Sequence, residues 1–344
     1  MATGISVHVG VNIVSPSVFD VERVPPLRNC LKDSQAMFDI AKNRFLFDAR
    51  DPFLGSNATF DNVVLAILEA AQELGDGDTF LFTFSGHGSQ QSEDEDDLLG
   101  GGAVIDEPDR KDEGIVLFDK ILLDDFLRRN VWSQFTKGVR IIGVADCCRG
   151  GSILSASTLN PLNDPAVAFP FPAPGGVLNA DVTLTGAAGR AARRGRNGRS
   201  ARPPSALPLS AVSDVNTEPV ATGSRPLTRE LGRVLRRAHI EASLPFYQML
   251  KKRILTDERG NLKADLLTLS ACTDEEDIPD GDEHGVFTQA LLDLFSGGAS
   301  PDDYDDLREK VEIIYRNQHR PQTPVITPED RTKVAFRTRR PFIL

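Results

Sequence analysis

The chain has 344 residues, of which 40% are hydrophobic and 26% charged, with a formal net charge of −11 at pH 7. This composition excludes a chain that is disordered throughout, and the excess of acid disfavours general nucleic-acid binding. No segment approaches the ~20 apolar residues that span a bilayer, and the first residues lack a signal-peptide pattern. We therefore expect a cytoplasmic protein without membrane contact.

The cysteines also restrict the function. There are four, Cys30, Cys147, Cys148 and Cys272. They are too few and too scattered for a disulfide framework, and none shows the paired spacing of a zinc site. Free thiols in a reducing compartment fit this pattern better.

Apolar patterns in the first half of the chain predict strands that alternate with helices. The predicted elements are, in chain order, a strand at 5–14, a helix at 29–43, a helix capped by Thr59 and stopped near Gly75, a strand at 79–84, a helix within 117–129 opened by Asp124 and Asp125, and a strand at 139–145. This alternation predicts an α/β fold with a mostly parallel sheet, in which functional groups gather beyond the carboxyl ends of the strands.

The second half predicts a long insertion and then more elements of the same domain. Residues 155–224 are rich in Pro, Gly, Ala, Ser and Arg without apolar periodicity, which is typical of a linker or an exposed loop. Order returns as a helix at 229–249, a strand at 264–271, and helices at 285–295 and 302–315. We divide the chain into a first catalytic part (1–154), a linker (155–228) and a second part that completes the domain (229–344).

Two strand ends carry residues suited to nucleophilic catalysis. His87 lies between glycines directly after the strand 79–84, and Cys147 and Cys148 follow the strand 139–145. A cysteine hydrolase needs a thiol, an imidazole that takes its proton, and amide groups aimed at the developing oxyanion. The alternatives without a catalytic role are a surface loop histidine and two buried, packed thiols. The position of the thiols before Gly150 and Gly151 favours an exposed nucleophile.

The motifs "FTFSGHG" and "IIGVADCCRGG" together resemble the caspase and metacaspase superfamily, particularly the bacterial metacaspase-like proteins called orthocaspases. The resemblance implies a caspase-like three-layer α/β/α sandwich with a mostly parallel central sheet. It implies that His87 is the general base, that Cys148 rather than Cys147 is the nucleophile, and that the amides of Gly88 and Cys148 form the oxyanion hole.

The resemblance extends to a specificity pocket. "LRNCLKD" is similar to a metacaspase segment in which a Cys-x-x-Asp pair, here Cys30 and Asp33, helps to form that pocket. Asp146 stands where caspases carry an amide, and Ser85 adds a polar contact. Two carboxylates with no obvious partner attract Arg or Lys, so we expect cleavage after these residues rather than after Asp. The alternative for Asp146 is a cap on the helix that follows its strand.

An enzyme that cuts after arginine would find substrate in its own linker. The self-cleavage candidates share an acid-free, arginine-rich stretch: Arg190, Arg193, Arg194, Arg196, Arg199 and Arg202. The alternative is an uncut solubilising loop. A nucleic-acid contact is disfavoured because the stretch lacks interleaved aromatic residues.

Two further expectations concern calcium and redox chemistry. Many metacaspases respond to calcium, and four carboxylates match the family's acidic pairs: Asp112, Glu113, Asp124 and Asp125. However, Ser155 stands where family members carry a further aspartate, so we leave calcium activation open and expect no required cofactor. Cys147 either modulates Cys148 through a vicinal disulfide or, as we favour, is a packing residue on the other side of the strand end.

The leading hypothesis is an Arg/Lys-specific cysteine endopeptidase, a thiol protease acting on polypeptides as a monomer. Its main rival is a catalytically impaired caspase-like binding scaffold, because Arg149 stands where metacaspases usually carry His and Ser155 where they carry Asp. Another Cys-His hydrolase or acyltransferase is a third class. Intact His87 and Cys148 favour the peptidase.

Overall fold

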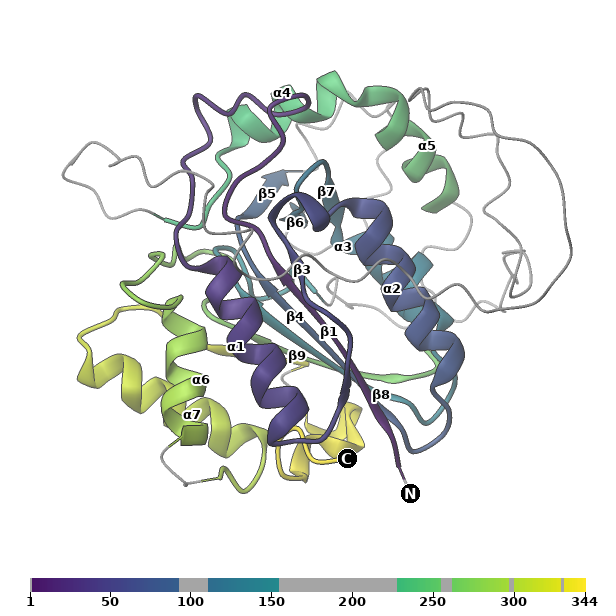
Figure 1. Ribbon diagram of the computed structural model, residues 1–344, viewed down its shortest axis with the longest axis vertical. Helices are drawn as coiled ribbons and strands as arrows, with labels where there is room; N and C mark the ends of the chain where they lie inside the picture. The colour runs from purple at the N-terminus through teal and green to yellow at the C-terminus, as the bar shows by residue number, and fades with distance from the viewer. Residues whose placement is uncertain (1, 93–110, 155–227, 255–261, 297–299, 329–330) are drawn as a thin grey trace, which may run out of the picture. The chain divides into compact units, whose positions relative to one another are not determined.

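The protein was analysed as a computed structural model, which describes residues 2–92, 111–154, 228–254, 262–296, 300–328 and 331–344. These ranges all belong to one structural unit. Its centre is a seven-stranded sheet in the order β10-β9-β8-β4-β1-β2, with β3 paired to β1 (Figure 1). The strands are β1 (Gly4–Gly10), β2 (Asp48–Ala49), β3 (Phe53–Leu54), β4 (Thr79–Ser85), β8 (Arg140–Asp146), β9 (Asp265–Ser270) and β10 (Val325–Thr327).

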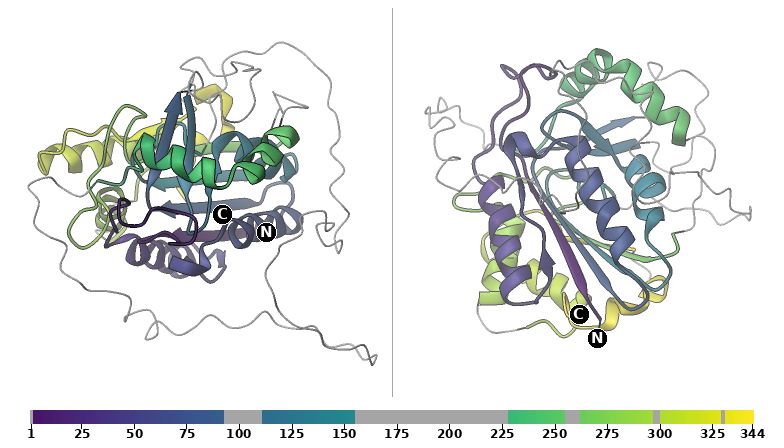
Figure 2. Two further views of the ribbon diagram at one scale, coloured as in Figure 1. Left: turned by 90° about the horizontal axis from the view of Figure 1, so that it is seen from above. Right: turned by 45° about the vertical axis from the view of Figure 1, so that its right-hand side comes forward.

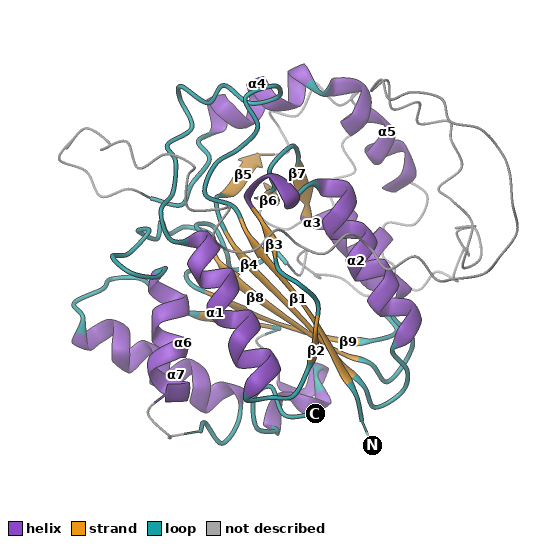
Figure 3. Cartoon of the chain, in the orientation of Figure 1, coloured by secondary structure: helices purple, strands orange, loops and turns teal. Residues whose placement is uncertain are grey.

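All strand pairs of this sheet are parallel except the pair formed by β9 and β10. Helices cover both faces, as Figure 3 shows with strands in orange between two groups of purple helices. One face carries α1 (Cys30–Asn43), α6 (Val286–Ser296) and α7 (Tyr304–Asn317), and the other carries α2 (Phe60–Glu73) and α3 (Asp124–Phe126). The prediction of an α/β sandwich with a mostly parallel sheet is confirmed.

The alternation of side chains along each strand decides which residues meet which helices. Phe80, Phe82 and Phe84 of β4 pack in the core on the α2 face, whereas Leu81 packs in the core on the α1 and α6 face. By the same alternation, Ser85 and the matching side chains of β8 point to the α1 and α6 face. Residues at the carboxyl ends of β4 and β8 are thus directed toward one side of the sheet.

A small antiparallel sheet extends from the end of β4. It consists of β5 (Gly88–Ser92), β6 (Lys111–Val116) and β7 (Ile121–Leu123). The residues before the helix that was predicted within 117–129 form a strand, because residues 121–123 pair with β6. The helix does begin at Asp124, as predicted, and continues as a π-helical turn (Leu127–Val131) and a 3-10 turn (Trp132–Gln134).

Several predicted boundaries have clear local causes. Thr59 caps α2 as predicted, accepting a hydrogen bond from the Asn62 amide at 3.3 Å. The predicted strand at 5–14 ends early, at Gly10, where α1 passes so close that a Cβ would lie 2.4 Å from the Cys30 carbonyl oxygen. The remaining short 3-10 turns are Gly55–Asn57, Arg331–Lys333 and Ala335–Thr338.

The predicted helix at 229–249 is wrong at its beginning. Residues 228–231 are extended, and the helices that follow are α4 (Arg233–Ala242) and α5 (Leu244–Ile254). Thr228 bridges to Pro279 and Glu230 bridges to Gly88, so tertiary pairing overrides local helix propensity here. In Figures 1 and 2, α4 and α5 (green) lie at the end of the sheet where the parallel strands finish.

The described helices also bear on membrane contact. None of those in the described ranges combines the length and the apolar character needed to cross a bilayer.

Candidate active site

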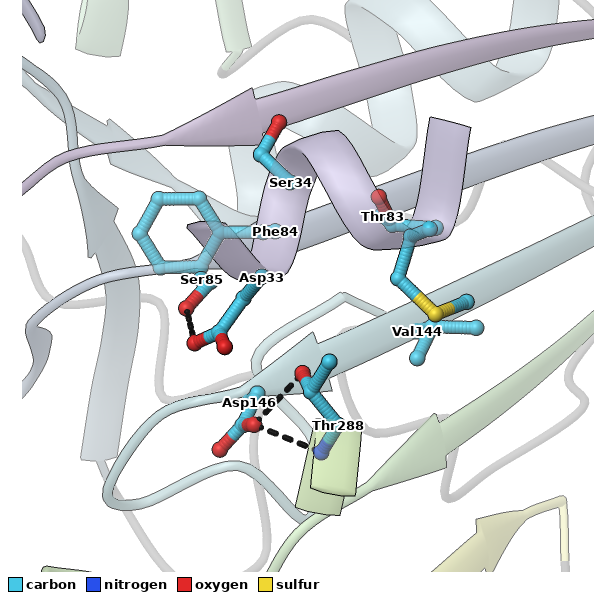
Figure 4. Close-up of a pocket in the computed structure, with 9 residues that line it drawn as sticks. Asp33, Ser34, Thr83, Phe84, Ser85, Val144, Asp146 and Thr288 are labelled. Carbon is cyan, nitrogen blue, oxygen red and sulfur yellow. Dashed lines mark hydrogen bonds between the residues drawn. The ribbon is translucent and has the colours of Figure 1, made fainter. Parts of the chain in front are cut away.

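The carboxyl ends of β4 and β8 form the floor of a polar pocket. Ser85 and Asp146 are directly paired residues at these two ends, and Asp33 projects toward them from the first turn of α1. Figure 4 shows the three side chains turned toward one another, with Thr288 of α6 beside Asp146. The cavity left among them is small, ≈10 Å³, room for about one water molecule.

The pocket is filled by an arginine of the same chain. The Arg229 guanidinium lies 2.7 Å from an Asp33 carboxylate oxygen, 3.1 Å from Asp146 Oδ1 and 2.9 Å from Asp280 Oδ1. It also donates to Ser85 Oγ at 2.8 Å. All of these side chains are buried. The expectation that the two carboxylates had no partner in the chain is therefore wrong, because Arg229 is that partner.

Asp280 is a pocket residue that the sequence analysis missed. Its Oδ1 accepts from Arg229 Nε at 3.1 Å, and its Oδ2 accepts from the Arg28 amide at 2.7 Å. The available signal was the acidic run 274–283, which contains too many carboxylates for the pattern to single one out. The pocket thus holds three carboxylates rather than the two that were predicted.

The segment before α6 braces the carboxylates. Asp33 Oδ1 accepts from the His284 ring at 3.0 Å and from the Gly285 amide at 2.9 Å. Gly285 is required there, since a Cβ would lie 2.3 Å from Asp146 Oδ2. These contacts fix the carboxylates in place before any substrate arrives.

Asp146 contacts both the start of α6 and Arg229. Its Oδ2 accepts from the Thr288 amide at 2.8 Å and from the Thr288 hydroxyl at 2.7 Å, which caps the first turn of α6. The capped helix is not the one that follows β8 in sequence, so that version of the alternative is wrong. The other oxygen, Oδ1, forms the ion pair with Arg229.

The charges perturb one another. Burial works to raise the pKa of Asp33, but the His284 hydrogen bond and the Arg229 ion pair outweigh it and leave the pKa below its usual value. Burial raises the pKa of Asp146 despite Arg229. The surrounding carboxylates raise the pKa of Arg229 against its burial, so this side chain stays charged.

Cys30, the other residue expected in the pocket, is the first residue of α1 and is fully buried. Burial raises the pKa of its thiol, with Arg229 and hydrogen bonding between Cys30 and Ser85 acting in the opposite direction. Cys30 therefore lies beside the pocket as a neutral neighbour of Ser85 and Arg229.

His87 is held by its Nε2 atom, which lies 2.9 Å from the Pro25 carbonyl oxygen. Only an N–H can make this bond, so the proton is on Nε2 and Nδ1 is the basic nitrogen. Nδ1 is buried and has no hydrogen-bond partner among the described residues. Burial lowers the pKa of His87 to about 4, although the hydrogen bond to the Pro25 carbonyl acts in the opposite direction.

Cys148 is held separately from His87 in this state. The Ile278 amide donates to Sγ at 3.0 Å, and the thiol donates to the Ile278 carbonyl oxygen at 3.4 Å. Burial raises the pKa of the Cys148 thiol. The thiol and the imidazole are therefore both neutral here, and their recorded hydrogen bonds go to the main chain rather than to each other.

The two predicted oxyanion donors meet at one oxygen atom. The amides of Gly88 and Cys148 both donate to the carbonyl oxygen of Arg229, at 2.9 Å and 3.3 Å. The approach is close enough to require glycine at position 88, because a Cβ would lie 2.0 Å from the Cys148 carbonyl oxygen. The Arg229 carbonyl thus occupies the place where a peptide carbonyl would be polarised.

Cys147 and Cys148 belong to different faces of the sheet. Cys147 packs in the core on the α2 face, and Cys148 packs with the core residues around α6. All four cysteines are free, so this structure contains no vicinal disulfide. Packing of Cys147 on the far side of the strand end is the arrangement that we favoured from the sequence.

Three of the four carboxylates expected to hold calcium have described side chains, and these have other partners. Glu113 accepts from Gln90 at 2.8 Å and from Ser152 at 3.1 Å, and Asp125 pairs with Arg129 at 3.3 Å. Within the described ranges no group of three or more His, Cys, Asp or Glu side chains is suited to a metal ion. Asp124 accepts from the Asp125 amide at 2.9 Å. These described side chains therefore do not fit a calcium site.

Some predicted residues lie where the structure gives no description. The side chain of Asp112 is one of them. Ser155 and the self-cleavage candidates of the linker also lie outside the described residues: Arg190, Arg193, Arg194, Arg196, Arg199 and Arg202.

Known proteins resemble this chain in sequence and in fold. The Caspase domain family, Peptidase C14, matches residues 12–336. Metacaspase-1 of Kluyveromyces lactis is 29% identical over 37% of this chain and 30% of its own length, and Metacaspase-1 of Arabidopsis thaliana is 24% identical over 40% and 38%. The matched region thus spans about a third of these curated relatives.

A solved structure supports the fold assignment. Protein GSU0716 from Geobacter sulfurreducens superposes with a TM-score of 0.64 over 99% of both chains at 24% identity. The resemblance first indicated by the "SGHG" and "DCCRGG" motifs is confirmed, and the chain belongs to the caspase domain family of cysteine peptidases.

Proposed function

We propose that the protein is a cysteine endopeptidase that cleaves polypeptides after arginine or lysine through Cys148 and His87. The single observation that supports this proposal is the position of Arg229 in the pocket. Its guanidinium lies among three buried carboxylates while its carbonyl oxygen accepts from the amides of Gly88 and Cys148. A substrate arginine with the same pose would present its scissile carbonyl to the nucleophile.

The pocket chemistry favours arginine over lysine and excludes aspartate. The guanidinium uses Nε, Nη1 and Nη2 together on Asp280, Ser85 and Asp33. A lysine ammonium carries the same charge but cannot form this planar set of contacts, so we expect it to bind less tightly. An aspartate would add a fourth carboxylate to a buried acidic site, which is strongly unfavourable.

The proposed reaction uses Cys148 as the nucleophile and His87 as the general base. His87 Nδ1 takes the Cys148 thiol proton as Sγ attacks the carbonyl carbon, and the amides of Gly88 and Cys148 stabilise the oxyanion. The peptide bond then breaks, and the leaving nitrogen takes the proton from Nδ1. Water, losing a proton to Nδ1, hydrolyses the thioester and regenerates the thiol.

The test is labelling with an arginyl peptide that ends in a thiol-reactive electrophile. We expect stoichiometric labelling at Cys148, loss of labelling in Cys148→Ala, and normal labelling in the matched control Cys147→Ala. A folded wild-type chain that is neither labelled nor able to hydrolyse arginyl peptides would instead support the binding-scaffold alternative. Esterase activity without peptide hydrolysis would support a different hydrolase or transferase.

A monomeric state and a cytoplasmic location stay predictions, and calcium activation stays open. Calcium has no fitting set of described ligands, so no step of the proposed reaction depends on it. Comparing turnover in calcium and in chelator tests this directly, and equal rates are the expected outcome for the described site.

A further inference from the structure

The nitrogens of the Arg229 guanidinium are all engaged by oxygen atoms. Nε donates to Asp280 Oδ1 at 3.1 Å. Nη1 donates to Ser85 Oγ and to the Asp146 carbonyl oxygen, both at 2.8 Å. Nη2 donates to Asp33 Oδ2 at 2.7 Å and to Asp280 Oδ1 at 2.9 Å. A guanidinium has five N–H donors and no acceptor, so the pocket offers an oxygen contact for each donor.

The guanidinium is also closely surrounded. Arg229 is fully buried, and a Cβ at Gly285 would lie 2.5 Å from Nη1 and 2.6 Å from Nη2, so Gly285 lies directly against both terminal nitrogens. The small cavity shown in Figure 4 adds no space at these nitrogens, because the residues that line it do not include Arg229. Within the part of the chain that the structure describes, neither terminal nitrogen has room for an added group.

Methylation of an arginine changes these terminal nitrogens without removing the charge. A methyl group replaces one N–H, and its carbon would overlap the oxygen that lies 2.7–2.9 Å from the same nitrogen. It would also leave that buried oxygen without its donor, which is costly. A substrate arginine that takes the place of Arg229 therefore fits only with both terminal nitrogens unmodified.

Deimination, which converts arginine to citrulline, changes the same group differently. It replaces one terminal nitrogen by a carbonyl oxygen and removes the positive charge. In this pocket the new oxygen would face an acceptor in place of a donor, either at Ser85 and the Asp146 carbonyl or at Asp33 and Asp280. Buried carboxylates that lose their cationic partner are strongly destabilised.

We propose that the pocket distinguishes unmodified arginine from methylarginine and citrulline, so that methylation or deimination of a substrate arginine protects the following peptide bond from cleavage. The proposal rests on the proposed function and narrows its substrate class. A pocket that selected only for positive charge would accept methylarginine. Here the ring of oxygen contacts and the position of Gly285, rather than charge alone, make the distinction.

Ser85 is the contact at which this distinction can be relaxed. It is the last residue of β4, and its hydroxyl both accepts from Nη1 and donates to Asp33 Oδ2 at 2.7 Å. Ser85→Ala removes the oxygen beside Nη1 and leaves the space of one hydroxyl there, while the three carboxylates stay. A single methyl group on the terminal nitrogen would fit into that space.

The experiment measures kcat/KM for matched peptides in which the residue before the scissile bond is arginine, ω-monomethylarginine, asymmetric dimethylarginine or citrulline. In the wild-type chain we expect the monomethylated peptide to be hydrolysed at least ~10²-fold less efficiently than the arginine peptide, and the other two to show no detectable hydrolysis. A control peptide keeps arginine before the scissile bond and carries ω-monomethylarginine further along, and it should be hydrolysed like the unmodified peptide. In Ser85→Ala, the ratio of kcat/KM for the monomethylated peptide to that for the arginine peptide should rise about tenfold.

Hydrolysis of the monomethylated peptide within a few-fold of the arginine peptide would overturn the inference and leave the proposed function standing, because the pocket would then select for charge alone. An unchanged ratio in a folded Ser85→Ala chain would overturn it as well, since the contact at Nη1 would not be the cause of the selectivity. Absence of both arginyl peptide hydrolysis and Cys148 labelling would instead remove the proposed function, and this inference with it.

Discussion

The specificity pocket and the reactive pair differ in how far they are assembled. In the pocket, the charged groups already have their partners: Asp33, Asp146 and Asp280 all contact Arg229. In the reactive pair, Cys148 and His87 are neutral, and their recorded hydrogen bonds go to the main chain. Under the proposed function, recognition rests on side chains at strand ends and helix starts that already have their partners, whereas the chemistry needs the Cys148 thiol to leave its contact with Ile278.

The strongest way to break this comparison is to remove the nucleophile and leave the pocket intact. Cys148→Ala should reduce hydrolysis of arginyl peptides by at least ~10³-fold, because no other group can form the acyl intermediate. Cys147→Ala, on the opposite face of the strand end, is the matched control and should keep most activity. A Cys148→Ala enzyme that still turns over peptides would show that the reactive pair has been misassigned.

Removing one pocket charge should have the next largest effect. Asp146→Asn keeps an oxygen for the cap on α6 but loses the ion pair with Arg229 or a substrate arginine. A buried charged contact is worth about 1.5–3 kcal/mol, so kcat/KM for arginyl peptides should fall roughly 10- to 100-fold.

The control for this charge is Glu283→Gln, whose carboxylate side chain is 84% exposed and should affect hydrolysis little. Both variants are compared by steady-state kinetics on the same arginyl peptide. Equal loss in the two variants, or no loss in Asp146→Asn, would remove Asp146 from the pocket.

Burial of His87 predicts where peptide hydrolysis declines in acid. The pKa of His87 is lowered from 6.5 to about 4, so the base form persists in mild acid, and kcat/KM for arginyl peptides should decline only below about pH 4.

The profile is measured as kcat/KM against pH, with circular dichroism to confirm that the fold persists at each pH. A decline that begins near pH 6.5 would contradict the role of burial.

Much of the frame was predictable because it follows local rules. The spacing of apolar residues predicts strands β4 and β8 and helix α1, and the preference of Thr for helix N-caps predicts the cap at Thr59. The same rules placed "SGHG" and "DCCRGG" at neighbouring strand ends. Glycine at position 88 was noted in that motif, and the structure adds the reason, which is the close approach of the Cys148 carbonyl.

The missed residues depend on contacts between distant segments. Asp280 and Arg229 meet Asp33 only after residues far apart in sequence fold together, and nothing in the acidic run 274–283 singles out one carboxylate. Local helix propensity also favoured a helix from residue 229. Propensity takes no account of the ion pairs that Arg229 forms with three carboxylates. The pocket partner was therefore expected to be a substrate, although the chain supplies one itself.

The central claim is that the buried acids select a cationic residue before the scissile bond. The most direct test is kcat/KM for a matched peptide series in which only that residue varies among arginine, lysine, alanine and aspartate. The account predicts that arginine is best, that lysine is weaker, and that aspartate shows no detectable hydrolysis. Equal or better cleavage of the aspartyl or alanyl peptide would contradict it.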